Sequence, residues 1–173
     1  MAALLAVSIA HPFVSVDART IVQSWRFGYQ LLLGSPLGRL ALRQPRLLDL
    51  MLTTETDAMV EPRVYSEVIA EPDRARASES LYRTFLLSEV PRLRRYRDEV
   101  LQVPTVLAVG DRDPVIRPSM LDGFEEHAHE MTIEIIRGAG HFVPEEAPDE
   151  LAELALATFE PWRSEHAATA GTK

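Results

Sequence analysis

Three short apolar runs stand out along the chain, at residues 3–10, 103–109 and 131–136. Runs of this length with few polar positions predict buried β-strands rather than surface helices. The first run is closed by His11-Pro12, where the proline disfavours helical continuation through its neighbour. Apolar residues on both faces are typical of parallel strands that are covered by helices on two sides. The sequence therefore predicts three buried strands.

The long segment between the first two runs, residues 15–91, carries helical patterns and no convincing strand. Ser15 and Asp17 offer N-caps for a helix that continues to about Leu33. Proline restricts the residue before it, so each proline marks a break between helices. Pro72, the last proline at such a break, suits the first position of a helix that continues to about Leu87. The breaks fall at Gly34-Ser35-Pro36, Gln44-Pro45, Glu61-Pro62 and Glu71-Pro72.

After residue 100 the pattern alternates between strand and helix. We expect one helix from about Pro118 to Ala128, between the second and third strands, and a last helix opened by Pro148. Strand–helix–strand order of this kind predicts parallel strands with right-handed crossovers. With only three strands, one edge of the sheet would stay open. The apolar positions of the last helix fall largely on one face, at Leu151, Leu154, Ala155, Thr158, Phe159 and Trp162.

These patterns predict an α/β fold with parallel strands, flanking helices and an inserted helical block. Residues 1–14 and 98–163 would form the part that contains the sheet, and residues 15–97 the helical part. Residues 164–173 are small and polar, and we expect them to form a disordered tail.

The distribution of charge narrows the classes of function. The net charge is −8, and residues 101–173 hold 14 acids and 5 bases against 12 acids and 13 bases in residues 1–100. This acidic balance argues against nucleic acid as a partner. The one basic run, Arg92–Arg97, is interpreted as a solvated helix end, where arginine favours the negative pole of the helix dipole, rather than an anion site.

The absence of cysteine excludes disulfide bonds and thiolate metal sites. The longest apolar run, residues 2–10, is too short to span a bilayer. It has the length of a signal-peptide core, but no lysine or arginine precedes it, which favours the buried strand. We therefore expect a cytoplasmic protein without a membrane anchor.

Two short motifs carry the candidate chemistry. Gly-Asp-Arg-Asp at 110–113 follows the second predicted strand, and Gly-Ala-Gly-His-Phe at 138–142 follows the third, with 28 residues from Asp113 to His141. Open α/β sheets place their sites at the carboxyl ends of strands. A carboxylate on one imidazole nitrogen fixes the tautomer, so that the other nitrogen can activate water or a nucleophile. Asp111 competes for the role of the acid, and the structural alternative is a surface turn with a loop histidine.

The remaining histidines, His11, His127, His129 and His166, are interpreted as structural or solvated. His127 and His129 are two residues apart and would point to different sides of a helix, which makes a poor metal pair. We expect no metal site and no cofactor.

The segment at residues 103–159 resembles the C-terminal end of the α/β-hydrolase fold. That family commonly shows a strand ending in Gly-x-x-Asp, then a Gly-x-Gly-His-type loop and a helix opened by proline, and residues 110–113 and 138–141 match this pattern. The resemblance implies that His141 is the base and Asp113 its partner. The helical block sits where this fold inserts its cap, and the first predicted strand resembles the strand just after the nucleophile-bearing helix.

The helical block also resembles the cap of epoxide hydrolases. Phe-Gly-Tyr-Gln-Leu around Tyr29, followed by Pro36, is similar to their first cap-tyrosine motif, and Ser-Leu-Tyr-Arg around Tyr82 lies where their second cap tyrosine falls. The resemblance implies that both phenols donate hydrogen bonds to the epoxide oxygen. A phenol with a pKa of about 10 is protonated at neutral pH, yet acidic enough to assist a departing alkoxide. An aspartate would attack the ring carbon, and His141 with Asp113 would activate the water that hydrolyses the ester.

The structural alternative for both tyrosines is core packing with a satisfied hydroxyl. Trp25 is interpreted as part of the core of the cap. A haloalkane dehalogenase would use halide-binding donors such as tryptophan, and the pair of tyrosines makes that activity the less favoured interpretation.

One part of the expected machinery is missing from the sequence. There is no Gly-x-Ser-x-Gly elbow, the string Gly34–Gly38 has the wrong order, and no Asp-Trp or His-Gly string supplies a family-type nucleophile or oxyanion turn. Asp17 precedes a helix with no strand directly before it, and we interpret it as an N-cap. We therefore expect an epoxide-hydrolase-like α/β-hydrolase that is truncated before Met1 and inactive alone.

Two other functions stay open at this point. The same aspartate–histidine pair would serve a serine-type esterase or a carbon–carbon hydrolase, so the nucleophile of the intact protein is either aspartate or serine. Alternatively, the chain is a non-catalytic module that docks its open sheet edge on a partner. The expected partners are a small apolar substrate in the intact family, and either a second copy of the chain or a missing N-terminal half.

Overall fold

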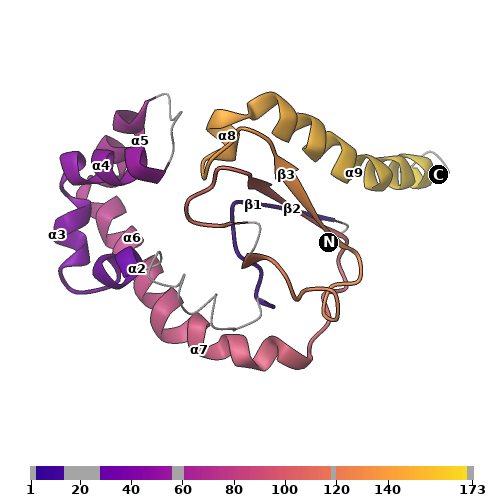
Figure 1. Cartoon of the computed structure of the whole chain (residues 1–173), viewed down its shortest axis with the longest axis horizontal. Helices are drawn as coiled ribbons and strands as arrows, with labels where there is room; N and C mark the ends of the chain where they lie inside the picture. The colour runs from indigo at the N-terminus through magenta and orange to yellow at the C-terminus, as the bar shows by residue number, and fades with distance from the viewer. Residues whose placement is uncertain (1–2, 14–27, 56–60, 118–119, 171–173) are drawn as a thin grey trace. The chain divides into compact units, whose positions relative to one another are not determined.

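The computed structural model describes residues 3–13, 28–55, 61–117 and 120–170. The chain divides into two compact units, which are drawn in Figure 1. The first unit combines residues 1–14 with residues 100–173, and the second consists of residues 15–99. Ser15, Asp17 and Trp25, which carried sequence predictions, lie outside the described residues.

The first unit contains a parallel sheet of three strands, in the order β1-β2-β3. β1 spans Leu4–Val7, β2 spans Thr105–Gly110 and β3 spans Met131–Ile136. In the register of the sheet, Val7 of β1 aligns with Ala108 of β2. The three predicted strands and their parallel direction are thus confirmed.

Burial differs among the three strands. β2 lies in the middle of the sheet, and its residues Leu107, Ala108 and Val109 are at most 1% exposed. β1 pairs only with β2 among the described strands, and its residues are half-buried or exposed rather than buried as predicted. β1 also ends three residues earlier than the predicted limit of residue 10. Ser8 has a φ of 48°, a left-handed conformation that turns the chain out of the strand direction.

The link between β2 and β3 corrects the prediction of a helix from Pro118 to Ala128. Residues 120–130 form irregular turns, and 118–119 lie outside the described residues. Gly123 has a φ of 93°, which interrupts a right-handed helix. Leu121 nevertheless is fully buried, so the link is packed against the unit without regular helical structure.

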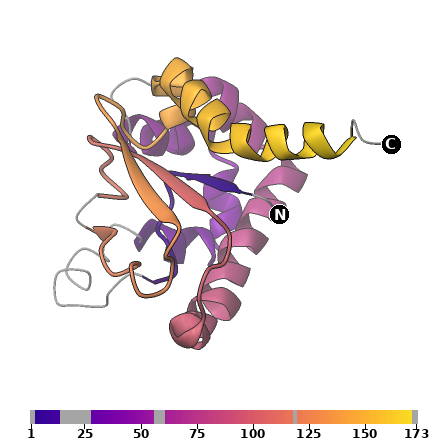
Figure 2. The same cartoon turned by 90° about the vertical axis from the view of Figure 1, so that its right-hand side faces the viewer.

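Two helices follow the sheet. α8 spans Val143–Glu146, and α9 spans Pro148–Ala170 and contacts β1. Figures 1 and 2 show α9 running past the strands towards the C-terminus. The predicted apolar face of α9 is half-buried as far as Phe159, whereas Trp162 is exposed. Residues 164–173 were predicted to form a disordered tail, but α9 continues to Ala170. The alanines at this end of the chain favour a helix.

The described residues of the second unit form helices joined by short turns, with no strand among them, as predicted. Prolines lie in the first turn of α5 and α6, where the missing N–H costs no intrahelical hydrogen bond. The described helices are α2 (Gly28–Leu33), α3 (Gly38–Leu42), α4 (Pro45–Glu55), α5 (Pro62–Ile69), α6 (Pro72–Thr84), α7 (Val90–Arg92) and a 3₁₀ helix at Leu93–Asp98.

The helix predicted from Pro72 to Leu87 changes its form at residue 85. Residues Phe85–Glu89 form a π-helical turn, in which the N–H of Val90 donates to the carbonyl of Phe85. The cause is Pro91, whose ring would clash with the carbonyl four residues earlier in an α-helix. The wider turn accommodates the proline without ending the helical course of the chain.

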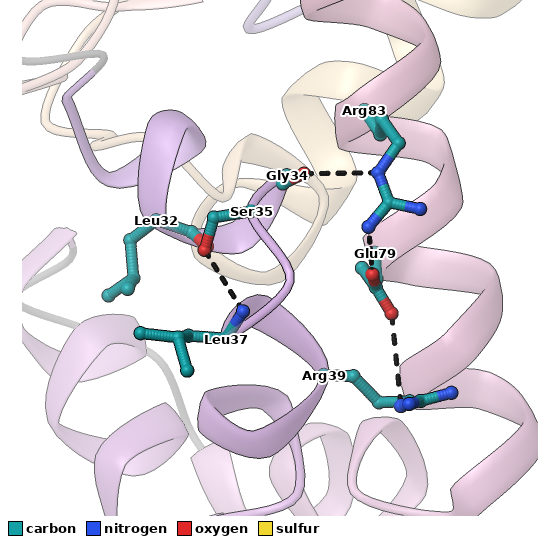
Figure 3. Close-up of polar contacts among 7 residues, drawn as sticks. All are labelled: Leu32, Gly34, Ser35, Leu37, Arg39, Glu79 and Arg83. Atoms are coloured by element: carbon teal, nitrogen blue, oxygen red, sulfur yellow. Dashed lines mark hydrogen bonds and ion pairs between the residues drawn. The ribbon is translucent and has the colours of Figure 1, made fainter.

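An ion cluster on α6 joins three parts of the second unit, as Figure 3 shows. Glu79 is buried and forms ion pairs with Arg83, one turn along α6, and with Arg39 on α3. The Nε of Arg83 donates to the carbonyl of Gly34 at 3.3 Å, just beyond the end of α2. The hydroxyl of Ser35 closes the turn that leads to α3, because it accepts the N–H of Leu37 at 3.2 Å.

A second cluster surrounds His11 in the first unit. The Nε2 of His11 lies 2.8 Å from the carbonyl of Leu121, and its Nδ1 accepts the N–H of Phe13 at 3.2 Å. The residue is 8% exposed, and its ring meets that of Phe124 edge-to-face with centroids 5.8 Å apart. Only the neutral tautomer with the proton on Nε2 satisfies both hydrogen bonds. Burial lowers the pKa of His11 from its ordinary value of 6.5. The hydrogen bond to the backbone of Leu121 and the negative charges of Glu125 and Asp122 act in the opposite direction but are smaller.

Acidification is expected to destabilise the first unit through His11. The unfolded chain binds a proton to this residue below pH 6.5, whereas the native chain resists it, so the free energy of unfolding falls as the pH drops below 6.5. The slope is at most about 1.4 kcal/mol per pH unit, the limit for one proton. Urea denaturation between pH 7.5 and 5.5 measures it. His11→Gln should reduce this slope, and His129→Gln, at an exposed position, should not; equal slopes in all three proteins would contradict the assignment.

Removal of the buried carboxylate of α6 is expected to loosen the second unit. Glu79→Ala takes the acceptor from two arginines and should lower the free energy of unfolding by about 2 kcal/mol. The control is Glu89→Ala, which breaks a pair with Arg92 whose side chains are 45% and 54% exposed and should cost less than about 1 kcal/mol. Urea denaturation compares the two variants. Equal losses would mean that the cluster contributes no more than a surface ion pair.

Candidate functional site

The two motifs at the carboxyl ends of β2 and β3 meet through one hydrogen bond. The Nδ1 of His141 lies 2.9 Å from Oδ2 of Asp113. Asp113 is 3% exposed, whereas the side chain of His141 is 19% exposed. The structure therefore brings together the two residues that the sequence analysis paired, at the edge of the sheet where open α/β folds place their sites.

The second oxygen of Asp113 is held by the backbone. Its Oδ1 accepts the N–H groups of Val115 at 2.7 Å and Ile116 at 2.8 Å. These bonds stabilise the ionised carboxylate in a buried position and fix its rotation. In turn, the carboxylate orients the imidazole so that Nδ1 carries the proton and Nε2 is the basic nitrogen. The pair can thus take a proton at Nε2 while Asp113 stabilises the resulting imidazolium.

Asp111, the alternative acid, makes a different contact. Its Oδ1 accepts the N–H of Gly138 at 2.7 Å, so it binds the backbone of the histidine loop. The geometry therefore favours Asp113 as the partner of His141 and gives Asp111 a structural contact.

The glycines of the two motifs explain why the loops can approach. Gly138 has a φ of 80°, the left-handed region that favours glycine. A Cβ on Gly110 would lie only 2.2 Å from the carbonyl oxygen of Ala139. That oxygen also accepts the N–H of Arg112 at 3.0 Å. The absence of a side chain at residue 110 is thus what lets the loop after β3 lie against the loop after β2.

Glu146 is a residue of the site that the sequence analysis missed. Its carboxylate accepts the backbone N–H groups of Gly140 at 2.6 Å and Phe142 at 3.2 Å, on either side of His141. A signal for it exists in the sequence. Pro144 marks the start of a helical turn, and an acid in that turn can reach back to the N–H groups before it, as in a capping box.

The two candidate tyrosines form a pair within the second unit. The rings of Tyr29 on α2 and Tyr82 on α6 meet edge-to-face, with centroids 6.2 Å apart and planes at 80°. Both rings are half-buried and pack against a core cluster of Leu33, Leu42, Leu48 and Ala75. The structure thus brings together two residues that are 53 positions apart in the sequence, and the Glu79 cluster joins the helices that carry them.

The other histidines with described side chains lie in protein contacts or at the surface. His127 stacks on Phe13 with ring centroids 4.9 Å apart, next to His11, and His129 is exposed. The side chain of His166 lies outside the described residues. Within the described part of the chain, no cluster of three His, Cys, Asp or Glu side chains is arranged to hold a metal ion. No described helix is long and apolar enough to cross a membrane.

Known proteins resemble this chain in structure rather than in sequence. No protein-family profile and no curated protein sequence matches it. The epoxide hydrolase CorEH matches with a TM-score of 0.72 and 22% identity, over 92% of this chain and 59% of that one. An epoxide hydrolase variant from Solanum tuberosum matches with a TM-score of 0.68 and 18% identity, over 92% of this chain and 62% of that one. Cfl2 from Burkholderia cenocepacia matches with a TM-score of 0.66 and 23% identity, over 90% of this chain and 56% of that one.

These likenesses establish the fold. The chain has the α/β-hydrolase fold of the epoxide hydrolases that it resembles, as the motifs implied. It spans between 56% and 62% of the lengths of those structures.

Substitution of the glycine at the end of β2 is expected to separate the two loops. Gly110→Ala would push a Cβ into the carbonyl of Ala139 and should lower the free energy of unfolding by about 3 kcal/mol or more. A Cβ on Gly138 would meet no atom within 4 Å, but alanine would be strained at its positive φ. Gly138→Ala should therefore lower the free energy of unfolding by about 1–2 kcal/mol. Gly28→Ala, with no described atom within 4 Å of its Cβ, is the neutral control. Urea denaturation ranks the three variants, and a different order would contradict the argument.

Proposed function

We propose that this chain provides the water-activating pair and the two phenolic acids of an epoxide hydrolase that converts small apolar epoxides into diols. The observation that carries the proposal is the hydrogen bond of 2.9 Å between His141 and the buried Asp113. The edge-to-face pair of Tyr29 and Tyr82 supports it, together with the likeness in fold to epoxide hydrolases. The activity needs no metal and no organic cofactor.

The proposed reaction has two covalent steps. A carboxylate attacks one ring carbon, the carbon–oxygen bond breaks, and an ester forms with an alkoxide on the neighbouring carbon. The phenol of Tyr29 or Tyr82 gives its proton to that alkoxide. In the second step, Nε2 of His141 takes a proton from water, and the hydroxide attacks the ester carbonyl. The ester carbon–oxygen bond then breaks, the departing alkoxide takes the proton of the newly formed acid, and the diol leaves as the carboxylate is restored. The proton on His141 returns to the phenolate formed in the first step, which restores both groups. Asp113 stabilises the imidazolium during this step.

We infer that the attacking carboxylate is supplied from outside these 173 residues. The sequence holds no Gly-x-Ser-x-Gly or Gly-x-Asp-x-Gly string, and the chain spans 56–62% of the structures that it resembles. The proposal therefore assigns no turnover to this chain alone, since removal of a triad nucleophile abolishes most catalysis.

Substitution of the phenols is the test that separates this reaction from ester or carbon–carbon bond hydrolysis. In the protein produced from the longest reading frame that contains these residues, Tyr29→Phe and Tyr82→Phe should each lower kcat/KM for styrene oxide by about 100-fold, the usual effect of a general acid. In a serine-type esterase, by contrast, the same two substitutions should leave the hydrolysis of p-nitrophenyl acetate unchanged. Tyr65→Phe, at an exposed tyrosine of the same unit, is the matched control. Diol formation is followed by chromatography.

Four outcomes would reject the proposal. Undiminished diol formation by both Phe variants would remove the phenols from the reaction. Ester hydrolysis without diol formation would identify a serine-type esterase. Turnover of styrene oxide by the isolated 173-residue chain would show that no outside nucleophile is required. If the longest reading frame gives no hydrolysis at all and the chain elutes from size exclusion in a defined complex, the non-catalytic pairing module is the better assignment.

A further inference from the structure

The loop that presents His141 is held by a carboxylate from the helix that follows it. Oε2 of Glu146 accepts the N–H of Gly140 at 2.6 Å, and Oε1 accepts the N–H of Phe142 at 3.2 Å. One carboxylate thus binds the backbone on both sides of the histidine. Bonds of this kind to an ionised acceptor are about twice as strong as bonds between neutral groups.

Glu146 is itself fixed by the same short segment. Its backbone N–H donates to the carbonyl of Phe142 at 3.0 Å, so the two residues exchange hydrogen bonds in both directions. Val143, between them, is fully buried and anchors α8 in a cluster with Ala139 and Ala147. The carboxylate therefore extends from a helical turn that is held by this hydrogen bond and by the packing of Val143.

The glycine before the histidine leaves room for this contact. A Cβ on Gly140 would lie 2.9 Å and 3.0 Å from the two carboxylate oxygens of Glu146. A side chain at residue 140 would therefore displace the carboxylate. This contact explains the second glycine of the Gly-x-Gly-His motif in physical terms, whereas the first one, Gly138, is explained by its φ of 80°.

We propose that Glu146 is the positioning residue of His141, whose backbone clamp holds the imidazole against Asp113 with Nδ1 as the protonated nitrogen. Without the clamp, the loop can rotate, and the hydrogen bond of 2.9 Å to Asp113 is no longer enforced. In this assignment Glu146 acts on His141 through the backbone of the loop. The catalytic consequence rests on the proposed function, whereas the effect on the tautomer does not.

The test reads the imidazole directly. Two-bond ¹H–¹⁵N NMR correlations in the full 173-residue chain distinguish the Nδ1–H from the Nε2–H tautomer of His141 at pH 8. The unchanged chain should show Nδ1–H, and Glu146→Ala should shift the population towards Nε2–H and remove the downfield Nδ1–H resonance. Glu146→Gln keeps one acceptor oxygen and should give an intermediate result. Glu153→Ala, an exposed acid on α9, should match the unchanged chain.

The same variants in the longer reading frame test the catalytic consequence. Because a displacement of about 1 Å can cost roughly 100-fold in rate, Glu146→Ala should lower kcat for styrene oxide by that order. The ester intermediate should accumulate, since the loss falls on the step that needs His141. A shifted tautomer in a protein without epoxide turnover would support the positioning role and reject the proposed function.

Retention of the Nδ1–H tautomer and its downfield resonance in a folded Glu146→Ala chain would overturn the proposal. If Glu146→Ala does not fold, Glu146→Gln decides in its place, because its amide has nearly the same volume as the carboxylate. A Glu146→Gln chain with the spectrum of the unchanged chain would then overturn the proposal.

Discussion

The close approach of two backbones is the constraint on which the candidate site depends. Gly110 ends β2 and lies against Ala139 after β3, so closely that no side chain fits between them. This contact brings the loop of Asp113 to the loop of His141, although 28 residues of chain separate the two residues. A parallel sheet makes the arrangement possible, because neighbouring strands deliver their carboxyl ends to the same edge.

Three carboxylates hold His141 and its loop in place, each through a different contact. Asp111 holds the start of the loop at Gly138, Glu146 holds the backbone around the ring, and Asp113 holds the ring itself. Asp111 and Glu146 accept hydrogen bonds from backbone N–H groups of the loop. An irregular loop leaves such N–H groups without partners in secondary structure, and each of them needs an acceptor.

Much of this arrangement follows from the sequence, and the exceptions have physical reasons. The apolar run at 103–109 predicts the central strand, because burial on both faces leaves no polar positions. The helix predicted from about Pro118 to Ala128 is wrong for the described residues from 120 on, because Gly123 adopts a left-handed φ and Leu121 is buried in an irregular segment. Glu146 was missed because its partners are backbone groups, which every residue supplies, so that only its place in the turn opened by Pro144 indicates the contact.

Ser8, just after the end of β1, is a residue whose conformation and buried hydroxyl both lower the stability of the fold. It adopts a φ of 48°, and its buried hydroxyl has no hydrogen-bond partner in the described part of the chain. Each feature alone costs on the order of 1 kcal/mol. Glycine would remove both costs at once, so this position offers a protein engineer a single-residue route to a more stable scaffold, at a distance in sequence from either loop of the candidate site.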